Sequence, residues 1–299
     1  MSITIAQSVL EATQLLREAG VPEARREAAS LLAYAIGKDR TFIISHAEDL
    51  VSREQFESFH AYVERRAQGE PFQYITGHQE FFGLSFEVSK DVLIPRPETE
   101  LLVETALKVA GGPAARLSIC DIGTGSGCVA ITLLHELPLS RAIAIDVSEA
   151  AIRVARKNAD RHSVADRLSF MVSDCFSALA NFPMFDLIVS NPPYVAAGAL
   201  CGLQREVRDY EPRVALSPGF DGLQIIRLLL SQSGAYLNER GYLLIEIGFD
   251  QHAAIAEIID RDVWEFLDIP EDLQGIPRVV ALQKIGFRKA YQALDVQQG

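Results

Sequence analysis

The sequence has 299 residues, of which 48% are hydrophobic and 23% charged, so a packed core is expected and the length suits two domains. Asp and Glu outnumber Lys and Arg by 40 to 28, which gives a formal net charge of −12. Such an acidic chain is disfavoured as a general binder of nucleic acid or of anionic membranes, because both need a net basic surface.

Residues 1–75 are predicted to form a small helical bundle. Apolar side chains recur at helical spacing between Ile5 and Leu16, and a second helix is expected to stop at Gly37. Ser52, followed three residues later by Gln55, predicts a capping box at the start of another helix. A bundle of this kind carries no chemistry of its own, so we interpret it as a recognition or lid domain.

Residues 76–96 have a different pattern. Five apolar side chains from Phe81 to Val88 partly alternate with polar ones around Gly83, which predicts a β-hairpin. We interpret this stretch as the linker between two domains.

From residue 97 to residue 299, short apolar runs alternate with helix-like segments, which predicts an α/β domain built on a mostly parallel sheet. The runs occupy residues 117–122, 142–146, 168–174, 185–193 and 242–248. Two later runs, at 264–269 and 278–283, flank a turn-rich segment and predict an antiparallel terminal hairpin. We therefore expect a Rossmann-like catalytic domain at 97–299.

A glycine-rich loop follows the first of these runs. Its candidate cofactor-binding residues are Asp121, Gly123, Thr124, Gly125, Ser126 and Gly127. Glycines allow a tight strand-to-helix turn and a close approach of the backbone to a ligand. The spacing G-x-G-x-G differs from the G-x-G-x-x-G of dinucleotide binders. With an acid before it, able to hold an ammonium group, the loop resembles the nucleoside loop of S-adenosylmethionine-dependent methyltransferases.

Two further acidic positions end the next apolar runs. Asp146 can accept hydrogen bonds from ribose hydroxyls, a role shared by dinucleotide and S-adenosylmethionine folds. Asp174 and Cys175 are expected to border the adenine, although Asp174 is equally suited to cap a helix.

The most specific motif is Asn191-Pro192-Pro193-Tyr194. Consecutive prolines stiffen the loop and cannot donate backbone hydrogen bonds, but their carbonyls can accept them. With the side-chain carbonyl of Asn191, they offer convergent acceptors for a planar NH2 group, next to an aromatic ring. The tetrapeptide resembles the motif of amino-methyltransferases that act on adenine or cytosine amines, or on a glutamine amide.

Other segments distinguish among these substrates. They are IPRPETE at 94–100, YEPR at 210–213 and RVV at 278–280, together with Glu70-Pro71, Tyr74-Ile75, Gly77, Glu80-Phe81 and Gly83. Combined with DIGTGSG and NPPY, they resemble the release factor glutamine methyltransferase family over nearly the whole chain. Residues 1–60 match only in their helical character. Cys175 departs from the aromatic residue that family members can carry there, so no stacking role is expected of it.

The resemblance implies S-adenosylmethionine as the cofactor and N5-methylation of the glutamine in the Gly-Gly-Gln loop of class-1 peptide chain release factors. It maps cofactor contacts onto the glycine loop, Asp146, Asp174, Cys175 and Asn191. It maps substrate contacts onto Asn191, Pro192, Pro193 and Tyr194, among which Asn191, Pro192 and Tyr194 are the expected catalytic residues. The helical domain would then dock the release factor.

Three alternatives stay open at this point. A nucleic-acid exocyclic-amine (adenine N6) methyltransferase would use the same NPPY chemistry, although the net charge of −12 argues against it. A non-catalytic adenosyl-binding module and a dinucleotide reductase are less well supported, because the NPPY motif is intact and the glycine spacing differs. The sequence leaves the roles of Glu98 and Glu100 undecided.

The remaining expectations concern compartment and assembly. The four cysteines form no C-x-x-C motif, so we expect neither a metal site nor a disulfide framework. We expect the thiols to be reduced, as is usual in a cytoplasmic protein. Charged residues interrupt the N-terminal apolar run, and no stretch of about 18 apolar residues occurs, so no signal peptide or membrane span is expected. We expect a monomer.

Overall fold

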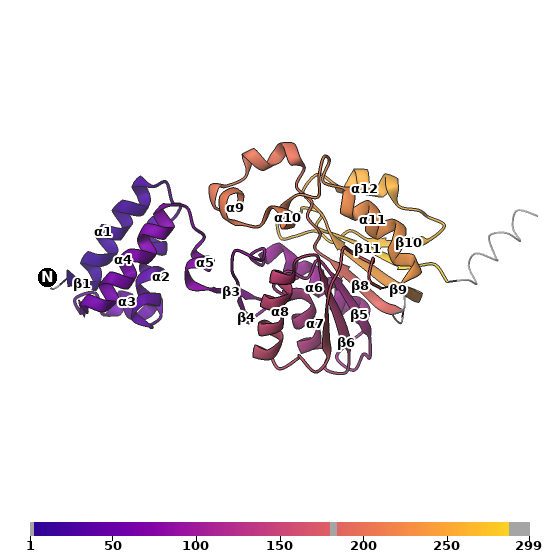
Figure 1. The fold of residues 1–299 in the computed structure, drawn as a ribbon, viewed down its shortest axis with the longest axis horizontal. Coiled ribbons are helices and arrows are strands. Elements are labelled where there is room, and N and C mark those ends of the chain that lie inside the picture. The colour runs from indigo at the N-terminus through magenta and orange to yellow at the C-terminus, as the bar shows by residue number, and fades with distance from the viewer. Residues whose placement is uncertain (1–2, 180–183, 287–299) are drawn as a thin grey trace, which may run out of the picture. The chain divides into compact units, whose positions relative to one another are not determined.

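The structure is a computed structural model that describes residues 3–179 and 184–286. The chain divides into two compact units (Figure 1). One comprises the residues up to His78 together with Leu203–Tyr210, and the other comprises Gln79–Gly202 and the residues from Glu211 onward. Residues 287–299 of the expected catalytic range lie outside the described residues. No helix within the described parts of the chain is both long and apolar enough to cross a membrane.

The first unit, called here the helical unit, is a bundle with a short two-stranded sheet. Its elements are β1 (Ile3–Thr4), α1 (Ile5–Glu18), α2 (Ala24–Ile36), α3 (Arg40–Ser45), β2 (Leu50–Val51), α4 (Arg53–Ala67), α5 (Phe72–Thr76) and α9 (Arg205–Tyr210). The capping box predicted at Ser52 and Gln55 is present, and Gly37 ends α2 in the left-handed conformation. Helix α3, which begins where the Asp39 side chain accepts from Phe42 N, is too short to show periodicity in the sequence.

A buried arginine organises one end of the helical unit. Arg66 is 4% exposed and pairs with Glu27 of α2 and, at 2.8 Å, with Glu206 of α9. The Tyr210 hydroxyl donates to the carbonyl of Gln68 at 3.2 Å. These contacts explain why the segment 203–210, far along the sequence, belongs to this unit.

The second unit, called here the catalytic unit after the domain expected from the sequence, contains a hairpin of β3 (His78–Phe81, whose first residue is counted with the helical unit) and β4 (Leu84–Glu87). Both turn residues, Phe82 and Gly83, have positive φ angles, of 50° and 73°. The backbone N–H of Phe82 donates to the Glu100 carboxylate at 2.8 Å, which fixes this turn. Glu100 therefore stabilises the hairpin.

A seven-stranded sheet forms the centre of the catalytic unit (Figure 1). Its strands are β5 (Ser118–Ile122), β6 (Arg141–Asp146), β7 (Leu168–Val172), β8 (Phe185–Ser190), β9 (Leu237–Glu246), β10 (Trp264–Asp268) and β11 (Val279–Lys284), in the order β10-β11-β9-β8-β5-β6-β7. Strands β5 to β9 pair in parallel, and β11 runs antiparallel between β9 and β10. The predicted parallel sheet with an antiparallel terminal hairpin is confirmed.

Helices cover both faces of this sheet. The helical segments of this unit are η1 (Pro97–Thr99), α6 (Glu100–Ala110), α7 (Cys128–Glu136), α8 (Glu149–Arg161), η2 (Ala197–Gly202), α10 (Arg213–Leu216), α11 (Gln224–Gln232), η3 (Ser233–Ala235) and α12 (His252–Ile258). Alternate strand residues point to opposite faces. Ile119 accordingly joins a core with α6 and α7, whereas the next residue, Cys120, joins a second core with α11 and α12.

Asn158 of α8 ties the hairpin to the glycine loop. It is fully buried, and its Oδ1 accepts from Glu87 N at 2.7 Å. Its Nδ2 donates to the carbonyls of Glu87 and Ser126, each at 2.9 Å. One side chain thus satisfies three backbone groups and fixes the loop against α8.

Replacing Asn158 with Ala is expected to lower the free energy of unfolding of the catalytic unit by about 2–3 kcal/mol, because buried backbone groups lose their partners. Urea unfolding of this unit can be followed by the fluorescence of Trp264, the single tryptophan of the sequence, which is 2% exposed.

Lys157→Ala is the matched control. Lys157 precedes Asn158 and also contacts Glu87, but through a salt bridge of 2.7 Å in which its own side chain is 64% exposed. The loss expected for Lys157→Ala is below about 1 kcal/mol. Equal losses for the two variants would contradict the role given to Asn158.

Candidate active site

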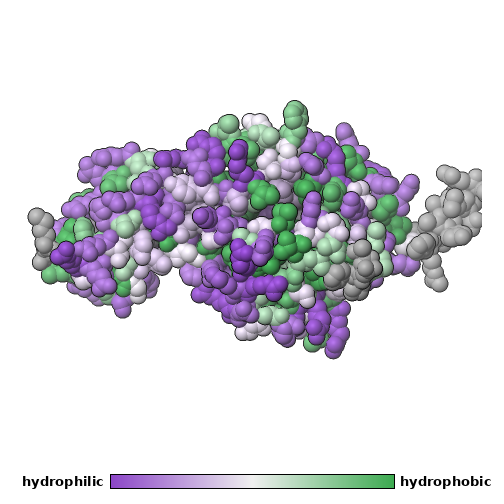
Figure 2. All heavy atoms as spheres, viewed as in Figure 1, coloured by the Kyte–Doolittle hydropathy of each residue, from purple (hydrophilic) through white to green (hydrophobic). Residues whose placement is uncertain are grey.

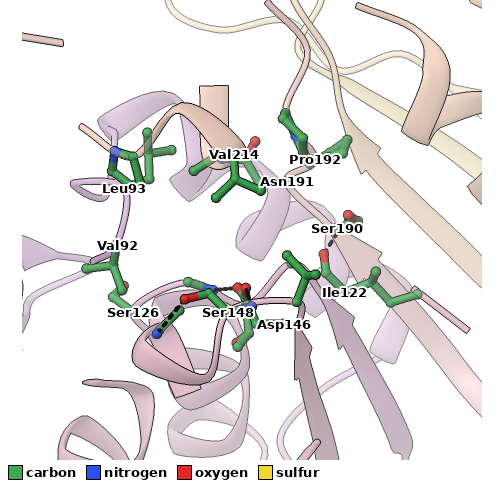
Figure 3. Close-up of a pocket in the computed structure, with 18 of the residues that line it drawn as sticks. Val92, Leu93, Ile122, Ser126, Asp146, Ser148, Ser190, Asn191, Pro192 and Val214 are labelled. Atoms are coloured by element: carbon green, nitrogen blue, oxygen red, sulfur yellow. Dashed lines mark hydrogen bonds between the residues drawn. The ribbon is translucent and has the colours of Figure 1, made fainter. Parts of the chain in front are cut away.

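A cavity of about 360 Å³ opens at the carboxyl ends of the parallel strands in the catalytic unit. Loops after neighbouring parallel strands meet at one sheet edge, where α/β folds bind their ligands. Figure 3 shows Asp146 and Ser148 on one side of the cavity, with Asn191 and Val214 across from them. The predicted site residues that line it are Asp121, Gly123, Thr124, Gly125, Ser126, Asp146, Asp174, Cys175, Asn191, Pro192 and Pro193.

The glycine loop is held against β6. The N–H groups of Gly123 and Thr124 both donate to the carbonyl of Ile145, each at 2.9 Å. Gly123 and Gly125 have φ angles of 77° and 55°, a region that favours glycine. A Cβ on Gly125 would meet no atom within 4 Å, so the backbone there faces open space.

Gly127, which was predicted to bind the cofactor, does not line the cavity. It begins α7 with a φ of 83°, and a Cβ there would lie 2.8 Å from Ile131 Cδ1 and 3.2 Å from the Cβ of Ala155. The absence of a side chain at Gly127 thus serves the packing of α7 against α8. G-x-G-x-G spacing alone cannot separate this packing glycine from the two that line the cavity.

Asp121 is a buried carboxylate in β5, just before the glycine loop. Its Oδ2 accepts from the Thr124 hydroxyl at 2.7 Å and from Ala130 N at 3.3 Å. Burial raises the pKa of Asp121 to about 7, against the lowering effect of these hydrogen bonds. A cation bound beside this carboxylate would favour its ionised form.

Asp146 ends β6 and bridges two loops. Its Oδ2 accepts from Gly125 N and its Oδ1 from Ser148 N, both at 2.9 Å. Burial raises the pKa of Asp146, and the hydrogen bonds from backbone N–H groups oppose that rise. Carboxylate oxygens have further lone pairs, so Asp146 can still accept from ligand hydroxyls.

The Asp174–Cys175 step follows the end of β7. Cys175 has a φ of 43°, an uncommon conformation for a non-glycine residue, and its side chain is buried. Burial, with the nearby charge of Asp174, raises the pKa of the Cys175 thiol to about 12. This thiol is therefore neutral and a poor nucleophile near neutral pH.

Asn191 follows β8 and reaches the cavity from the opposite side. Its Nδ2 donates to Thr99 Oγ1 at 3.0 Å, whereas no hydrogen bond of its Oδ1 is found among the described residues. Thr99 is 2% exposed and lies 92 positions earlier in the sequence. The side-chain carbonyl of Asn191 is thus left available to a ligand.

Tyr194 lies on the same loop but does not line the cavity. Its hydroxyl donates to Glu246 Oε1 at 3.4 Å, and its carbonyl accepts from Gln251 Nε2 at 3.0 Å. These two bonds tie the NPPY loop to β9 and to Gln251, which the sequence motif does not reveal. Contact of the Tyr194 ring with a substrate stays a prediction.

The IPRPETE segment is fixed by a second buried carboxylate. Glu211 is 4% exposed, pairs with Arg96, and accepts from Ile94 N at 3.3 Å. Sequence reasoning singled out both segments but not the pairing between them. Glu98 lies near Glu246 and raises the pKa of that carboxyl group.

Sequence reasoning also missed the apolar wall of the cavity. It is formed by Val92 and Leu93, from the segment after the hairpin, and by Val214 of α10 and Ile225 of α11 (Figure 3 labels the first three). Among the residues that the structure describes, no cluster of three or more His, Cys, Asp or Glu side chains could hold a metal ion.

A nucleoside that carries an ammonium group fits the hydrogen-bond acceptors of this cavity. The two carboxylates of Asp121 and Asp146 suit ammonium and hydroxyl donors and would repel a phosphate, and the volume is that of a small-molecule site. The Ser126 hydroxyl is buried and unpartnered among the described residues, which leaves one more polar group for a ligand.

Comparison with known proteins gives consistent matches. Residues 7–77 match the PrmC N-terminal domain family, and residues 97–204 match the Methyltransferase small domain family. A release factor glutamine methyltransferase of Koribacter versatilis is 41% identical over 282 residues, which cover 94% of this chain and 99% of the relative. Another, of Geobacter sulfurreducens, is 42% identical over 265 residues, covering 89% and 91%.

Among solved structures, a methyltransferase from Pyrococcus furiosus is similar with a TM-score of 0.50 at 19% identity, covering 69% of this chain and 91% of that chain. This similarity shows that the two share a fold. The two sequence relatives match this chain along nearly their whole length and at well over 30% identity. The chain therefore belongs to the release factor glutamine methyltransferase family.

Proposed function

We propose that this chain transfers the methyl group of S-adenosylmethionine to the side-chain nitrogen of the glutamine in the Gly-Gly-Gln loop of class-1 peptide chain release factors. The observation that carries the proposal is the fixed amide of Asn191, whose donor end is bound to Thr99 and whose acceptor end is free at the cavity. The names of the relatives support the choice of substrate.

Two carboxylates would hold the cofactor. Asp121 would attract its ammonium group, and Asp146 would accept from the ribose hydroxyls while fixing the backbone of Gly125. Asp174 and Cys175 would border the adenine. When bound, S-adenosylmethionine supplies an electrophilic methyl group on a positively charged sulfur.

The substrate amide nitrogen is a weak nucleophile, because its lone pair is delocalised into the carbonyl. We propose that the Asn191 side-chain carbonyl and the Pro192 carbonyl accept its two N–H groups and orient the nitrogen in line with the methyl group. The apolar wall of Val92, Leu93 and Val214 would help to exclude water once both ligands are bound. Methylation makes the nitrogen more acidic, and its proton passes to water as the products leave the pocket.

The surface favours a protein partner over a nucleic acid. Val214 lines the cavity and is 56% exposed, so the apolar wall continues onto the outer surface. Figure 2 shows hydrophobic groups gathered on the visible face of the catalytic unit. The net charge of −12 opposes binding to phosphate backbones.

We propose that the helical residues 1–75 dock the release factor. We also propose that the reaction takes place in the cytoplasm.

The direct test is mass spectrometry of a class-1 release factor incubated with the enzyme and S-adenosylmethionine. A mass gain of one methyl group on the Gly-Gly-Gln glutamine is expected. Transfer of labelled methyl to DNA or RNA, with none to the release factor, would instead favour the exocyclic-amine alternative.

Two substitutions at Asn191 test its role as an acceptor. Asn191→Ala is expected to lower the single-turnover rate by about 10²–10³-fold, the usual cost of losing one preorganised polar contact. Asn191→Asp keeps an acceptor but cannot donate to Thr99, so it should retain part of the activity. Near-wild-type rates for both variants at saturating cofactor would show that Asn191 does not hold the reacting amide.

Asp146→Ala should weaken S-adenosylmethionine binding by about 10–100-fold, because hydrogen bonds to a charged group contribute roughly 1.5–3 kcal/mol. The variant loses both the ribose acceptor and the partner of Gly125 N. Calorimetry of the folded variant measures the affinity, and an unchanged value would remove Asp146 from the cofactor site.

Asp121 should make cofactor binding pH-dependent. Its pKa is raised to about 7 in the free protein, so the carboxyl group is largely protonated at pH 6, and a bound ammonium must displace that proton. Affinity should therefore fall by about tenfold per pH unit below pH 7 and level off above pH 8. Calorimetry at pH 6, in buffers of different ionisation enthalpy, should detect the released proton.

Asp121→Asn is the control for this titration, because it keeps the side-chain shape but cannot ionise. Its affinity should be weaker and should vary little with pH from 6 to 8. A flat pH dependence in the wild-type protein would refute an ionic contact between Asp121 and the cofactor.

A further inference from the structure

Glu246 is a buried carboxylate outside the cavity lining. It is the last residue of β9 and is 1% exposed. Its Oε1 accepts only a long hydrogen bond, of 3.4 Å, from the Tyr194 hydroxyl, and its Oε2 has no partner among the described residues. A buried, incompletely satisfied carboxylate lowers stability, so its presence calls for an explanation other than fold stability.

The sheet register places Glu246 beside the NPPY loop. Ser190 of β8 pairs with Ile245 of β9, so Asn191 and Glu246 follow these partners at the same edge. The Thr99 hydroxyl lies close enough to Glu246 to lower its pKa, and it also accepts from Asn191 Nδ2 at 3.0 Å. Thr99 thus stands between the carboxylate and the amide.

The proton of Thr99 determines which way the amide is turned. A hydroxyl has one proton, and a carboxylate can only accept. An ionised Glu246 favours the rotamer in which that proton faces it, and Thr99 Oγ1 is then left to accept from the NH2 end of Asn191, which is the bond observed. Without the charge, Thr99 is free to donate to Oδ1 instead, and the Asn191 amide can flip.

We propose that Glu246 is a positioning residue for methyl transfer: through Thr99 it keeps the carbonyl oxygen of Asn191 available to the substrate amide, and through Tyr194 it anchors the loop. This inference deepens the proposed function and rests on it. A flipped Asn191 would present two N–H donors to a substrate that itself donates, so the reacting nitrogen would no longer be oriented.

The surroundings of Glu246 place its ionisation near neutrality. Burial, together with the nearby charge of Glu98, raises the pKa of Glu246 to about 7, against the lowering effects of Thr99, Arg278 and Tyr194. Because the folded-state pKa lies above the usual value, the ionised form is lost as the pH falls through about 7. The orienting effect should be lost with it.

The test uses full-length protein and single-turnover methylation of a release factor, with cofactor saturating at every pH. Glu246→Gln and Thr99→Val are each expected to lower the rate by about 10–100-fold, the cost of misplacing a reacting group. The cofactor Kd should change far less. Thr99→Ser, which keeps the hydroxyl, should recover most of the rate lost in Thr99→Val.

A double variant separates positioning from general damage. If Glu246 acts through Thr99, then Glu246→Gln combined with Thr99→Val should be no slower than the worse single variant. Thr105→Val is the matched control, because Thr105 is a buried threonine of α6 whose hydroxyl donates to its own helix at Leu101 O. It should methylate at the wild-type rate.

The pH profile supplies a second readout. The wild-type rate should rise through about pH 7 as Glu246 ionises, whereas Glu246→Gln should show a flatter profile at a lower rate. Additive losses in the double variant, or a wild-type profile in Glu246→Gln, would overturn the inference and leave the proposed function standing. Failure of the wild-type protein to methylate any release factor would overturn both.

Discussion

A carboxylate that is taken out of water must be given hydrogen-bond donors, and this requirement fixes the loops around the cavity. Each buried acid binds groups from a different loop. The contacts are Asp121 with Thr124 and Ala130, Asp146 with Gly125 and Ser148, Glu211 with Arg96 and Ile94, and Glu246 with Tyr194. The loops that form the cavity are therefore held by carboxylates, two of which, Asp121 and Asp146, also line it.

The division of donors and acceptors in this site matches its proposed chemistry. The proposed cofactor side would offer carboxylates to an ammonium group and to hydroxyls, and the proposed substrate side would offer the carbonyl oxygens of Asn191 and Pro192. Both ligands bring hydrogen atoms to be accepted, so the protein supplies acceptors on both sides. Such a site can act by orientation and exclusion of water, without a strong base beside the nitrogen.

Local patterns were enough to predict the fold. The strands of the sheet could be recognised from short apolar runs, and the capping box at Ser52 from four residues. The positions of the glycine loop and of Asn191 follow from these strands, because their ends meet at one edge. Pairings across long separations could not be predicted. Asn191 with Thr99 spans 92 positions, and Arg96 with Glu211 spans 115. A local pattern also could not show that Gly127 packs helices or that the Tyr194 hydroxyl donates to Glu246.

The cysteines differ in a way that makes one of them a convenient chemical handle. Cys120, Cys128 and Cys175 are buried, and burial raises the pKa of each thiol, whereas Cys201 is exposed. Thiolates are the reactive form, so a maleimide dye should modify Cys201 selectively in the native protein. Cys201 lies in η2, between the NPPY loop and α9. A fluorophore there would report on the chain that leads from the NPPY loop to α9 of the helical unit, without any engineered cysteine.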